Sequence, residues 1–361
     1  MKILHVETGR QFYGGPQQVI YLMSALAKRG IEGTLVCPPN SGIDSAAREA
    51  GISVRNLFCA GDLDLPFAYR LAQYLRDSRP DILHCHSRRG ADILGGIAAS
   101  TTDIPAVVSR RVENTEMHMI AAFRYRPFKK IIAISAAIAR VLQEHGVNHE
   151  RLVVIRDAVD SERFAQPADR DAFRREFGIP AGKLVIGAAG QLIPRKGHRH
   201  LLQAVAELRH SHPEMWLIIF GKGYLGNQLR AQAAALGLGG IVQFAGFRDD
   251  LDDFFGCLDI FAHPALTEGL GVVTLKAAAA GVPVVAFAAG GLTEAVVHGE
   301  TGLLVPPEDV AGLRNAIGSL IDDAEVRQRM GAAGRARMQA EFSIATMAEQ
   351  HVALYDAMLS A

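Results

Sequence analysis

The chain has 361 residues, 49% of them hydrophobic, which is more than one typical domain needs and suits two. Its 38 basic and 38 acidic side chains cancel, which excludes bulk, non-specific binding to nucleic acid. The four cysteines lack the spacing of a zinc or disulfide site, and no apolar run approaches the roughly 18 residues of a membrane span. We therefore expect a cytoplasmic protein that has no secretory leader and no metal site. We also expect that it does not bind nucleic acid.

Short apolar runs alternate with helix-period segments in the first half of the chain. Val19, Leu22, Met23 and Leu26 recur on one helical face, which predicts a helix over Gln17–Arg29. Strands are predicted at Ile3–Glu7, Thr34–Cys37, Val54–Leu57, Ile82–His86, Ala106–Arg111, Lys130–Ser135 and Leu152–Arg156. This alternation predicts βαβ units around a parallel sheet.

A polar stretch at residues 157–183 interrupts the pattern and reads as a connection between domains. Strands then resume at Leu184–Ala189, Trp216–Phe220, Ile241–Ala245, Leu258–His263, Val282–Phe287 and Gly302–Val305, with helices from Asp309 onward. The fold class is therefore α/β, with two similar parallel-sheet domains. Because such sheets bind ligands at the carboxyl ends of their strands, a cleft between the domains is the expected site.

Two glycine-containing loops each follow a predicted strand and precede a helix. Gly14-Gly15 follows the first strand, and Gly190–Gly197 (GQLIPRKG) follows Leu184–Ala189. Glycines let a ligand approach the backbone, and a helix start attracts anions. Arg195 and Lys196 in the second loop suit a diphosphate, which carries about two negative charges. The alternative for either loop is an ordinary turn.

A third loop, His263–Gly271 (HPALTEGLG), holds Glu268 between a predicted strand and a helix. A carboxylate accepts hydrogen bonds from sugar hydroxyls, and amides exposed at glycines can hold phosphate oxygens. Glu268 could instead cap the helix. The loop Ala289–Glu294 repeats the pattern, and three such loops at one sheet edge favour a ligand site.

Basic residues end two strands of the first half. His84 and His86 share one face of their strand, Ser87-Arg88-Arg89 follows, and Arg110 and Arg111 end the next strand. A histidine near a strand end is more often structural than catalytic, but arginines at two neighbouring strand ends predict an anionic ligand. The segment Phe123–Lys130 (FRYRPFKK) mixes aromatic and basic side chains, as in a contact with lipid headgroups or in an ordinary exposed loop.

The sequence resembles the family 4, GT-B fold, retaining glycosyltransferases over essentially its whole length. The resemblance rests on GGPQQVIYLMSALAKRG, PDILHCHS, IIAIS, GQLIPRKG and, above all, LDIFAHPALTEGLGVVTLKAAAAGVPVVAFAAGGLTEAVVHGETGLLVPPED. It implies two Rossmann-like domains facing across a cleft. Residues 1–165 would bind the acceptor, residues 166–343 the nucleotide sugar, and a final helix over residues 344–361 would cross back to the first domain.

By matched position, the resemblance implies that Lys196 and Arg195 hold the donor's diphosphate and that Glu268 bonds the hydroxyls of its sugar. The other donor contacts that it implies are backbone at Gly269, Leu270 and Gly271, Gly15 beside the diphosphate, and Phe247 and Arg248 at the base.

The chain departs from the family's pattern at several positions. A second glutamate is usual at the position of Lys276, which could reach a phosphate instead. Gln191 replaces a common arginine, and Asp157-Ala158 replaces Asn-Gly near the domain connection. Arg111 stands where the family often has a histidine, and it would be a cation beside the leaving group.

The expected activity is retaining transfer of a hexose or N-acetylhexosamine from a UDP-sugar, without a metal or other cofactor. Arg88, Arg110 and His86 are the expected acceptor contacts, and the acceptor is a glycan or a lipid-linked saccharide of surface polysaccharide or lipopolysaccharide. The enzyme would then work in the cytoplasm or at the inner membrane face. A nucleotide-sugar-binding protein without catalysis is the alternative, whereas a nicotinamide enzyme is disfavoured because the first βα turn lacks G-x-G-x-x-G.

Overall fold

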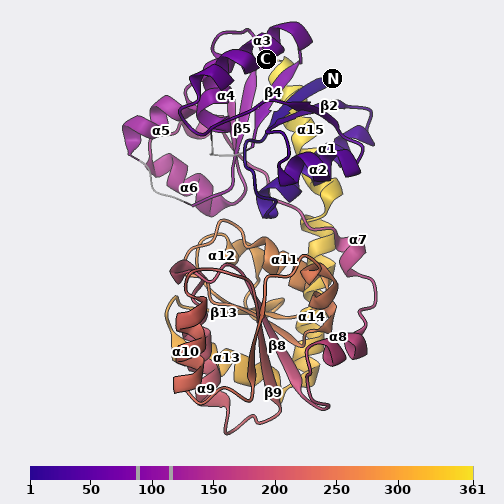
Figure 1. Ribbon diagram of the computed structural model, residues 1–361, viewed down its shortest axis with the longest axis vertical. Coiled ribbons are helices and arrows are strands. Elements are labelled where there is room, and N and C mark those ends of the chain that lie inside the picture. Colours follow the sequence, from indigo (N-terminus) through magenta and orange to yellow (C-terminus); the bar gives the residue numbers. More distant parts are fainter. Residues whose placement is uncertain (87–89, 114–116, 361) are drawn as a thin grey trace. The chain divides into compact units, whose positions relative to one another are not determined.

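The computed structural model describes residues 1–86, 90–113 and 117–360, and the chain divides into two compact units (Figure 1). The first unit combines Met1–Ala158 with Ile344–Ala361, and the second is Val159–Ser343. Each unit has its own parallel sheet, as the alternation of strands and helices predicts.

The sheet of the first unit has the strand order β3-β2-β1-β4-β5-β6-β7, and all its neighbouring strands are parallel. Its strands are β1 (Lys2–Val6), β2 (Glu32–Cys37), β3 (Ser53–Asn56), β4 (Ile82–Cys85), β5 (Ala106–Arg110), β6 (Lys130–Ala133) and β7 (Leu152–Val154). Its helices are α1 (Gly14–Ala27), α2 (Gly42–Glu49), α3 (Leu65–Ser78), α4 (Ala91–Ala99), α5 (His118–Tyr125), α6 (Ala136–Glu144) and α15 (Ile344–Ser360), with a short turn η1 (His149–Arg151). The strand order reverses between β1 and β4, the point at which sheets of this kind bind ligands.

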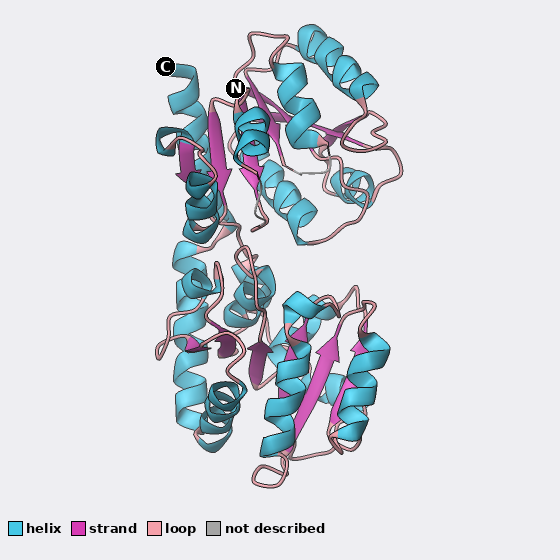
Figure 2. Ribbon diagram, turned by 90° about the vertical axis from the view of Figure 1, so that its left-hand side faces the viewer, coloured by secondary structure: helices cyan, strands magenta, loops and turns pink. Residues whose placement is uncertain are grey.

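The sheet of the second unit has the order β10-β9-β8-β11-β12-β13 and is likewise parallel, with helices on both of its faces (Figure 2). Its strands are β8 (Leu184–Ala189), β9 (Met215–Phe220), β10 (Val242–Gly246), β11 (Ile260–His263), β12 (Val284–Phe287) and β13 (Gly302–Val305). Its helices are α7 (Ser161–Phe164), α8 (Arg170–Glu176), α9 (His198–Leu208), α10 (Gly226–Ala235), α11 (Val272–Ala279), α12 (Leu292–Ala295), α13 (Val310–Asp322) and α14 (Ala324–Glu341), with turns η2 (Pro194–Lys196) and η3 (Leu251–Cys257). Here the order reverses between β8 and β11.

The last helix, α15, belongs to the first unit although it ends the chain. It packs against α1, and its Met347 and Tyr355 join a buried cluster with Leu22 and Ile82. The hydroxyl of Tyr355 also lies 2.7 Å from Nδ1 of His84 on β4. Apolar burial and this hydrogen bond together fix α15 to the first sheet.

Two boundaries differ from the sequence-based expectation. The first unit ends at Ala158 and not at residue 165, because Phe164 of α7 packs edge-on against Phe255 of the second unit, with ring centroids 5.8 Å apart. Helix α1 begins at Gly14 and not at Gln17, so Gly14 and Gly15 form its first turn and do not belong to a preceding loop. Among the described residues, no helix is both long and apolar enough to cross a membrane.

Candidate functional site

Loops at the carboxyl edge of the second sheet pack backbone to backbone, and three glycines make this possible. A Cβ atom at Gly197 would overlap the carbonyl oxygen of Pro264, and one at Gly291 would overlap that of Gly269. A Cβ at Gly221 would likewise overlap the carbonyl oxygen of Gly190, the residue that follows β8. The loops that follow β8, β9, β11 and β12 are therefore held in close contact, as the glycine pattern predicts.

Lys196 lies at the end of turn η2, immediately before helix α9. Its aliphatic stem runs beside Gly190, and its Nζ donates a hydrogen bond to Oε2 of Glu268. The two side chains are only 11% and 14% exposed, so the ion pair is largely shielded from water. Sequence reasoning predicts both residues as donor ligands, and the structure brings them into direct contact across the β8–β11 reversal point.

Glu268 has a second partner in His263, the last residue of β11. Nε2 of His263 lies 3.0 Å from the same Oε2 atom. Burial alone would raise the pKa of Glu268, but the hydrogen bond from His263 and the charge of Lys196 outweigh it and hold that pKa well below its usual range. An ionised carboxylate only accepts hydrogen bonds, so His263 must carry its proton on Nε2.

His198 opens helix α9, two residues after Lys196, and its side chain is almost completely buried. Burial, together with the nearby rings and charges of His263 and Lys196, lowers the pKa of His198 to about 4. The pKa of His263 is also lowered, chiefly by burial. Both imidazoles are therefore neutral near pH 7, and the fixed charges of the cluster are those of Lys196 and Glu268.

The backbone around Glu268 is shaped by its neighbours. The amide of Gly291 donates to the carbonyl of Glu268 at 2.9 Å, and Leu266 donates to the carbonyl of Arg195 at 2.8 Å. Gly271 adopts a left-handed φ of 82° and is the N-cap residue of α11, while Leu270 is buried beneath the loop. The residue Arg195 itself is exposed.

Three residues predicted to bind the donor have protein partners elsewhere in the second unit. Arg248 pairs with Asp250 at 2.5 Å and with Glu176 at 2.6 Å, and Lys276 binds both carboxylate oxygens of Asp252 at 2.7 and 2.9 Å. Phe247 is 46% exposed and makes a cation–π contact with Lys222, whose Nζ lies 4.5 Å from the centroid of the ring. Lys276 and Arg248 are thus neutralised locally, and Phe247 remains partly exposed.

In the first unit, Gly15 and Arg111 lie side by side at the β1–β4 reversal. A Cβ at Gly15 would lie 3.7 Å from Cδ of Arg111. Nε of Arg111 donates to Oδ1 of Asp157 at 3.1 Å, and its Nη1 donates to the carbonyl oxygen of His86 at 3.1 Å. Burial raises the pKa of Asp157, with Arg111 opposing the shift. The arginine at the family's histidine position is thus matched by an aspartate that pairs with it.

His86 belongs to a buried histidine cluster, His5, His84 and His86, and does not face solvent. Nδ1 of His5 lies 2.9 Å from Nε2 of His86, and the rings of His84 and His86 are 3.8 Å apart. The expected contact of His86 with an acceptor is therefore not supported. Its contacts with His5 and His84 indicate a structural role instead. The side chain of Arg110 is also buried, so its expected contact with an acceptor has no support in the structure, while Arg88 lies outside the described residues.

The three histidines are the described residues that come nearest to a metal site, since their ligand atoms lie within 4.8 Å of one another. Their geometry favours another role. His84 uses its two nitrogens on Tyr355 at 2.7 Å and on Ser109 at 2.8 Å, and the cation Arg111 approaches His86. The cluster thus links β1, β4 and β5 to helix α15, and binding a cation would break these bonds.

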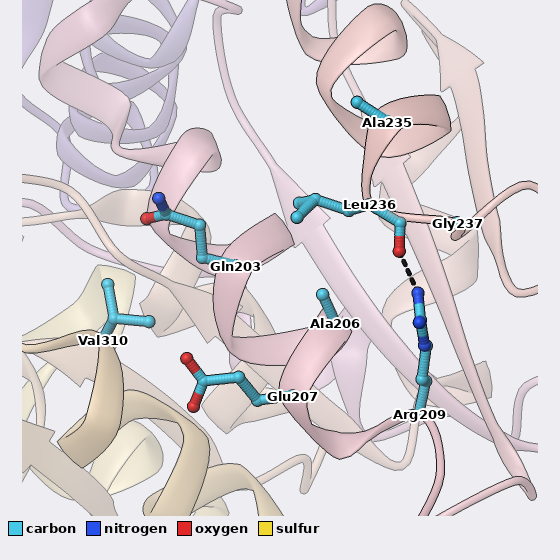
Figure 3. A pocket seen from close by; sticks show the side chains of 8 residues that line it. All are labelled: Gln203, Ala206, Glu207, Arg209, Ala235, Leu236, Gly237 and Val310. Atoms are coloured by element: carbon cyan, nitrogen blue, oxygen red, sulfur yellow. Dashed lines mark hydrogen bonds between the residues drawn. The ribbon is translucent and has the colours of Figure 1, made fainter.

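A separate cavity of about 610 Å³ lies between α9 and the end of α10 (Figure 3). Its lining consists of Gln203, Ala206, Glu207, Arg209, Ala235, Leu236, Gly237 and Val310. Arg209 donates to the carbonyl of Leu236 across one side of it. None of the residues predicted to bind a ligand lines this cavity, so it is distinct from the Lys196–Glu268 cluster.

Two partners of the predicted site residues, His263 and Asp252, escape prediction from sequence. His263 lies within the predicted HPALTEGLG loop, but the pattern assigns the chemistry to Glu268 alone. A histidine at the end of a strand, five positions before a loop carboxylate, is the signal that points to their contact. Asp252, the partner of Lys276, gives no signal because it lies in an ordinary acidic turn.

Comparison with known proteins gives matches in both units. The family model described as Glycosyltransferase Family 4 matches residues 13–163, and that described as Glycosyl transferases group 1 matches residues 169–337. The lipopolysaccharide core biosynthesis glycosyltransferase LpsE of Rhizobium meliloti (strain 1021) is 27% identical over 98% of both chains. The D-inositol 3-phosphate glycosyltransferase of Stackebrandtia nassauensis is 31% identical over 76% of this chain and 68% of that protein.

Solved structures cover nearly the whole chain. Anabaena Alr3699/HepE in complex with UDP has a TM-score of 0.88 at 24% identity, over 99% of this chain and 100% of that one. A glycosyltransferase from Rickettsia africae ESF-5 has a TM-score of 0.89 at 19% identity, over 99% and 98%. These likenesses and the two parallel sheets confirm the GT-B class of fold predicted from the sequence.

Proposed function

The chain belongs to the family 4, group 1 glycosyltransferases, and we propose that it is a retaining enzyme whose donor is a UDP-sugar. The transferred sugar is a hexose or an N-acetylhexosamine. The acceptor is a glycan or a lipid-linked saccharide of lipopolysaccharide or surface polysaccharide synthesis. The proposal includes no metal and no other cofactor.

The observation that carries the donor assignment is the Lys196–Glu268–His263 cluster at the reversal point of the second sheet. A nucleotide sugar presents two kinds of group, an anionic diphosphate and neutral hydroxyls. The cluster offers a matching cation and an ionised acceptor side by side, with the amino end of α9 adjacent. The choice of UDP follows the structural neighbour that was solved in complex with UDP.

In the proposed reaction, the bond between the anomeric carbon and the diphosphate oxygen breaks, and its electron pair leaves with the diphosphate. The acceptor hydroxyl attacks from the same face, and its proton passes to the departing diphosphate. Lys196 and the exposed Arg195 stabilise the charge that develops, which is the largest usual source of catalysis at such sites. Glu268 orients the sugar through its hydroxyls.

Arg111 is proposed as a further cation that favours departure of the diphosphate. Its pairing with the buried Asp157 fixes its guanidinium, while Gly15 leaves room beside its side chain. Among the described residues, its bonds to Asp157 and His86 occupy Nε and Nη1 only. Nη2 is therefore the group that we assign to the substrate.

The acceptor class rests on the relative that acts in lipopolysaccharide core biosynthesis. Met117, Met119, Ile120 and Phe123, on and just before α5, are exposed apolar side chains. The basic residue Arg126 directly follows the helix and is also exposed. Such a surface supports peripheral contact with an anionic membrane that carries the acceptor, at its cytoplasmic face.

A panel of sugar nucleotides tests this function. The protein would be assayed with UDP-glucose, UDP-galactose, UDP-N-acetylglucosamine and GDP-mannose, by thermal shift and by release of the nucleoside diphosphate. We expect stabilisation and turnover with a UDP-sugar, and an α-linked product by NMR when lipopolysaccharide core oligosaccharide is the acceptor. Binding without transfer or hydrolysis would contradict catalysis, and an inverted product would contradict retention.

A further inference from the structure

His263 occupies a rigid position beneath the proposed donor site. It is the last residue of β11, it pairs with Ala286 of β12, and its side chain is almost fully buried. Its ring lies nearly parallel to that of Phe261, with an interplanar angle of 13° and centroids 6.1 Å apart. Strand pairing and ring packing therefore leave the imidazole little freedom to turn.

Glu268, in contrast, stands on a loop, and its carboxylate is oriented by its two donors. Lys196 Nζ and His263 Nε2 both bond the same oxygen, Oε2. Within the part of the chain that the structure describes, no donor bonds Oε1. The paired bonds thus leave one carboxylate oxygen to accept a hydrogen bond from a ligand.

The two donors differ in how firmly they can hold that carboxylate. The ammonium of Lys196 ends a flexible four-carbon stem and has three hydrogens, so it can turn toward phosphate oxygens. The imidazole of His263 has one hydrogen on Nε2 and a fixed ring. The bond from His263 therefore persists when a diphosphate draws the ammonium away.

We propose that His263 is a positioning residue for the donor sugar, which holds Glu268 so that Oε1 accepts a hydroxyl of that sugar. This inference rests on the proposed function and assigns a role to a side chain that has none in it. His263 acts through Glu268 and touches no substrate itself. Its loss should weaken use of the sugar portion of the donor and spare recognition of the nucleoside diphosphate.

Two substitutions separate this role from simple packing. His263→Leu fills the buried space without a hydrogen-bond donor, whereas His263→Gln can place an amide N–H near the position of Nε2. The matched control is His212→Leu, at a histidine beyond the end of α9 that pairs with Asp322. Each variant would be measured with the sugar nucleotide that the wild type turns over in the panel above, and with the corresponding nucleoside diphosphate alone.

For His263→Leu we expect kcat/KM to fall between tenfold and a hundredfold, as loss of a hydrogen bond to a charged group does. The dissociation constant of the nucleoside diphosphate should change less than threefold. His263→Gln should recover most of the lost activity. Unchanged kcat/KM in His263→Leu, equal loss of nucleoside diphosphate affinity, or no recovery in His263→Gln would overturn the inference.

A double substitution guards against a folding defect. If His263 acts only through Glu268, adding His263→Leu to Glu268→Gln should lower kcat/KM less than threefold beyond the single change. A further tenfold loss in the double variant would show a role that does not pass through Glu268 and would overturn the inference. Failure of the wild type to bind any sugar nucleotide is a separate result, because it contradicts the proposed function itself.

Discussion

At the residue scale, the charges of the candidate site are set by a few contacts. Glu268 remains ionised because His263 and Lys196 together outweigh the effect of its burial. His263 and His198 remain neutral because burial dominates their pKa values. The site therefore holds one positive and one negative side chain in close contact near neutral pH, beside a helix start that favours anions.

Replacing Glu268 by glutamine tests the role of its charge. The amide has nearly the shape of the carboxylate but accepts weaker hydrogen bonds, and its NH₂ group can face Lys196 or His263 unfavourably. We expect kcat/KM for the sugar nucleotide to fall by roughly tenfold to a hundredfold, corresponding to about 1.4 to 2.7 kcal/mol. Steady-state kinetics give this ratio. Activity equal to that of the wild type would remove Glu268 from donor recognition.

At this scale, the sequence predicts which residues meet when charged residues lie in loops that directly follow predicted strands. Lys196 and Glu268 each follow a predicted strand in a glycine-containing loop, so their meeting follows from the parallel sheet. The partners of Lys276 and Arg248 could not be predicted, because Asp252, Asp250 and Glu176 carry no periodic signal. Which acidic group neutralises a cation depends on loop packing that the chain pattern does not encode.

At the scale of elements, glycine packing holds the site loops together. Gly197 has a left-handed φ of 67°, and its missing Cβ gives space to the Pro264 carbonyl. Gly197→Ala should therefore destabilise the second unit by more than about 1 kcal/mol, which is the least that a left-handed backbone costs a residue with a Cβ. Urea denaturation measures the change. Gly239→Ala is the control, since nothing lies within 4 Å of its Cβ position, and an equal effect of both substitutions would contradict the argument.

The buried histidines at the junction of the first sheet with α15 make this unit sensitive to acid. Burial lowers the pKa of His5 to about 3, and that of His351 on α15 to about 4, from an ordinary value of 6.5. As the pH falls below 6.5, the unfolded chain binds protons that the folded chain does not. Stability is therefore lost from pH 6.5 down to about 4 through His351 and down to about 3 through His5, by up to about 1.4 kcal/mol per pH unit for each histidine.

Removing one of these histidines should flatten that dependence. In His351→Leu, the free energy of unfolding measured by urea at pH 7.5, 6.5 and 5.5 should fall less steeply than in the wild type. His149→Gln replaces an exposed histidine of the same unit and serves as the control. A slope that is unchanged in His351→Leu would show that His351 does not take part in the acid sensitivity.

The elements themselves follow closely from the chain pattern, and the exceptions have physical causes. Each predicted strand is present, because buried parallel strands give continuous apolar runs. The early start of α1 at Gly14 was not predictable, since glycine is a poor helix former and here occupies only the first turn. The bond between His84 and Tyr355 joins residues at opposite ends of the chain, which periodicity alone cannot connect.

At the scale of the whole molecule, both sheets reverse their strand order at one point, and four of the candidate residues lie at these points. Lys196 and Glu268 follow β8 and β11 in the second unit, while Gly15 and Arg111 lie beside β1 and β4 in the first. Fold and family membership are readable from the sequence because they depend on long motifs. The identities of the sugar and the acceptor cannot be predicted from the sequence, because they depend on loop side chains that differ among proteins of one fold.

Calorimetric titration with UDP, on the wild type and on Lys196→Ala, tests the central claim most directly. The account predicts that the wild type binds UDP, that Lys196→Ala binds it at least tenfold more weakly, and that its turnover of the sugar nucleotide falls about a hundredfold. Arg199→Ala, which removes the same charge from an exposed site on α9, should bind UDP like the wild type. Equal UDP affinity in the wild type and in Lys196→Ala would contradict the assignment of this cluster to the donor's diphosphate.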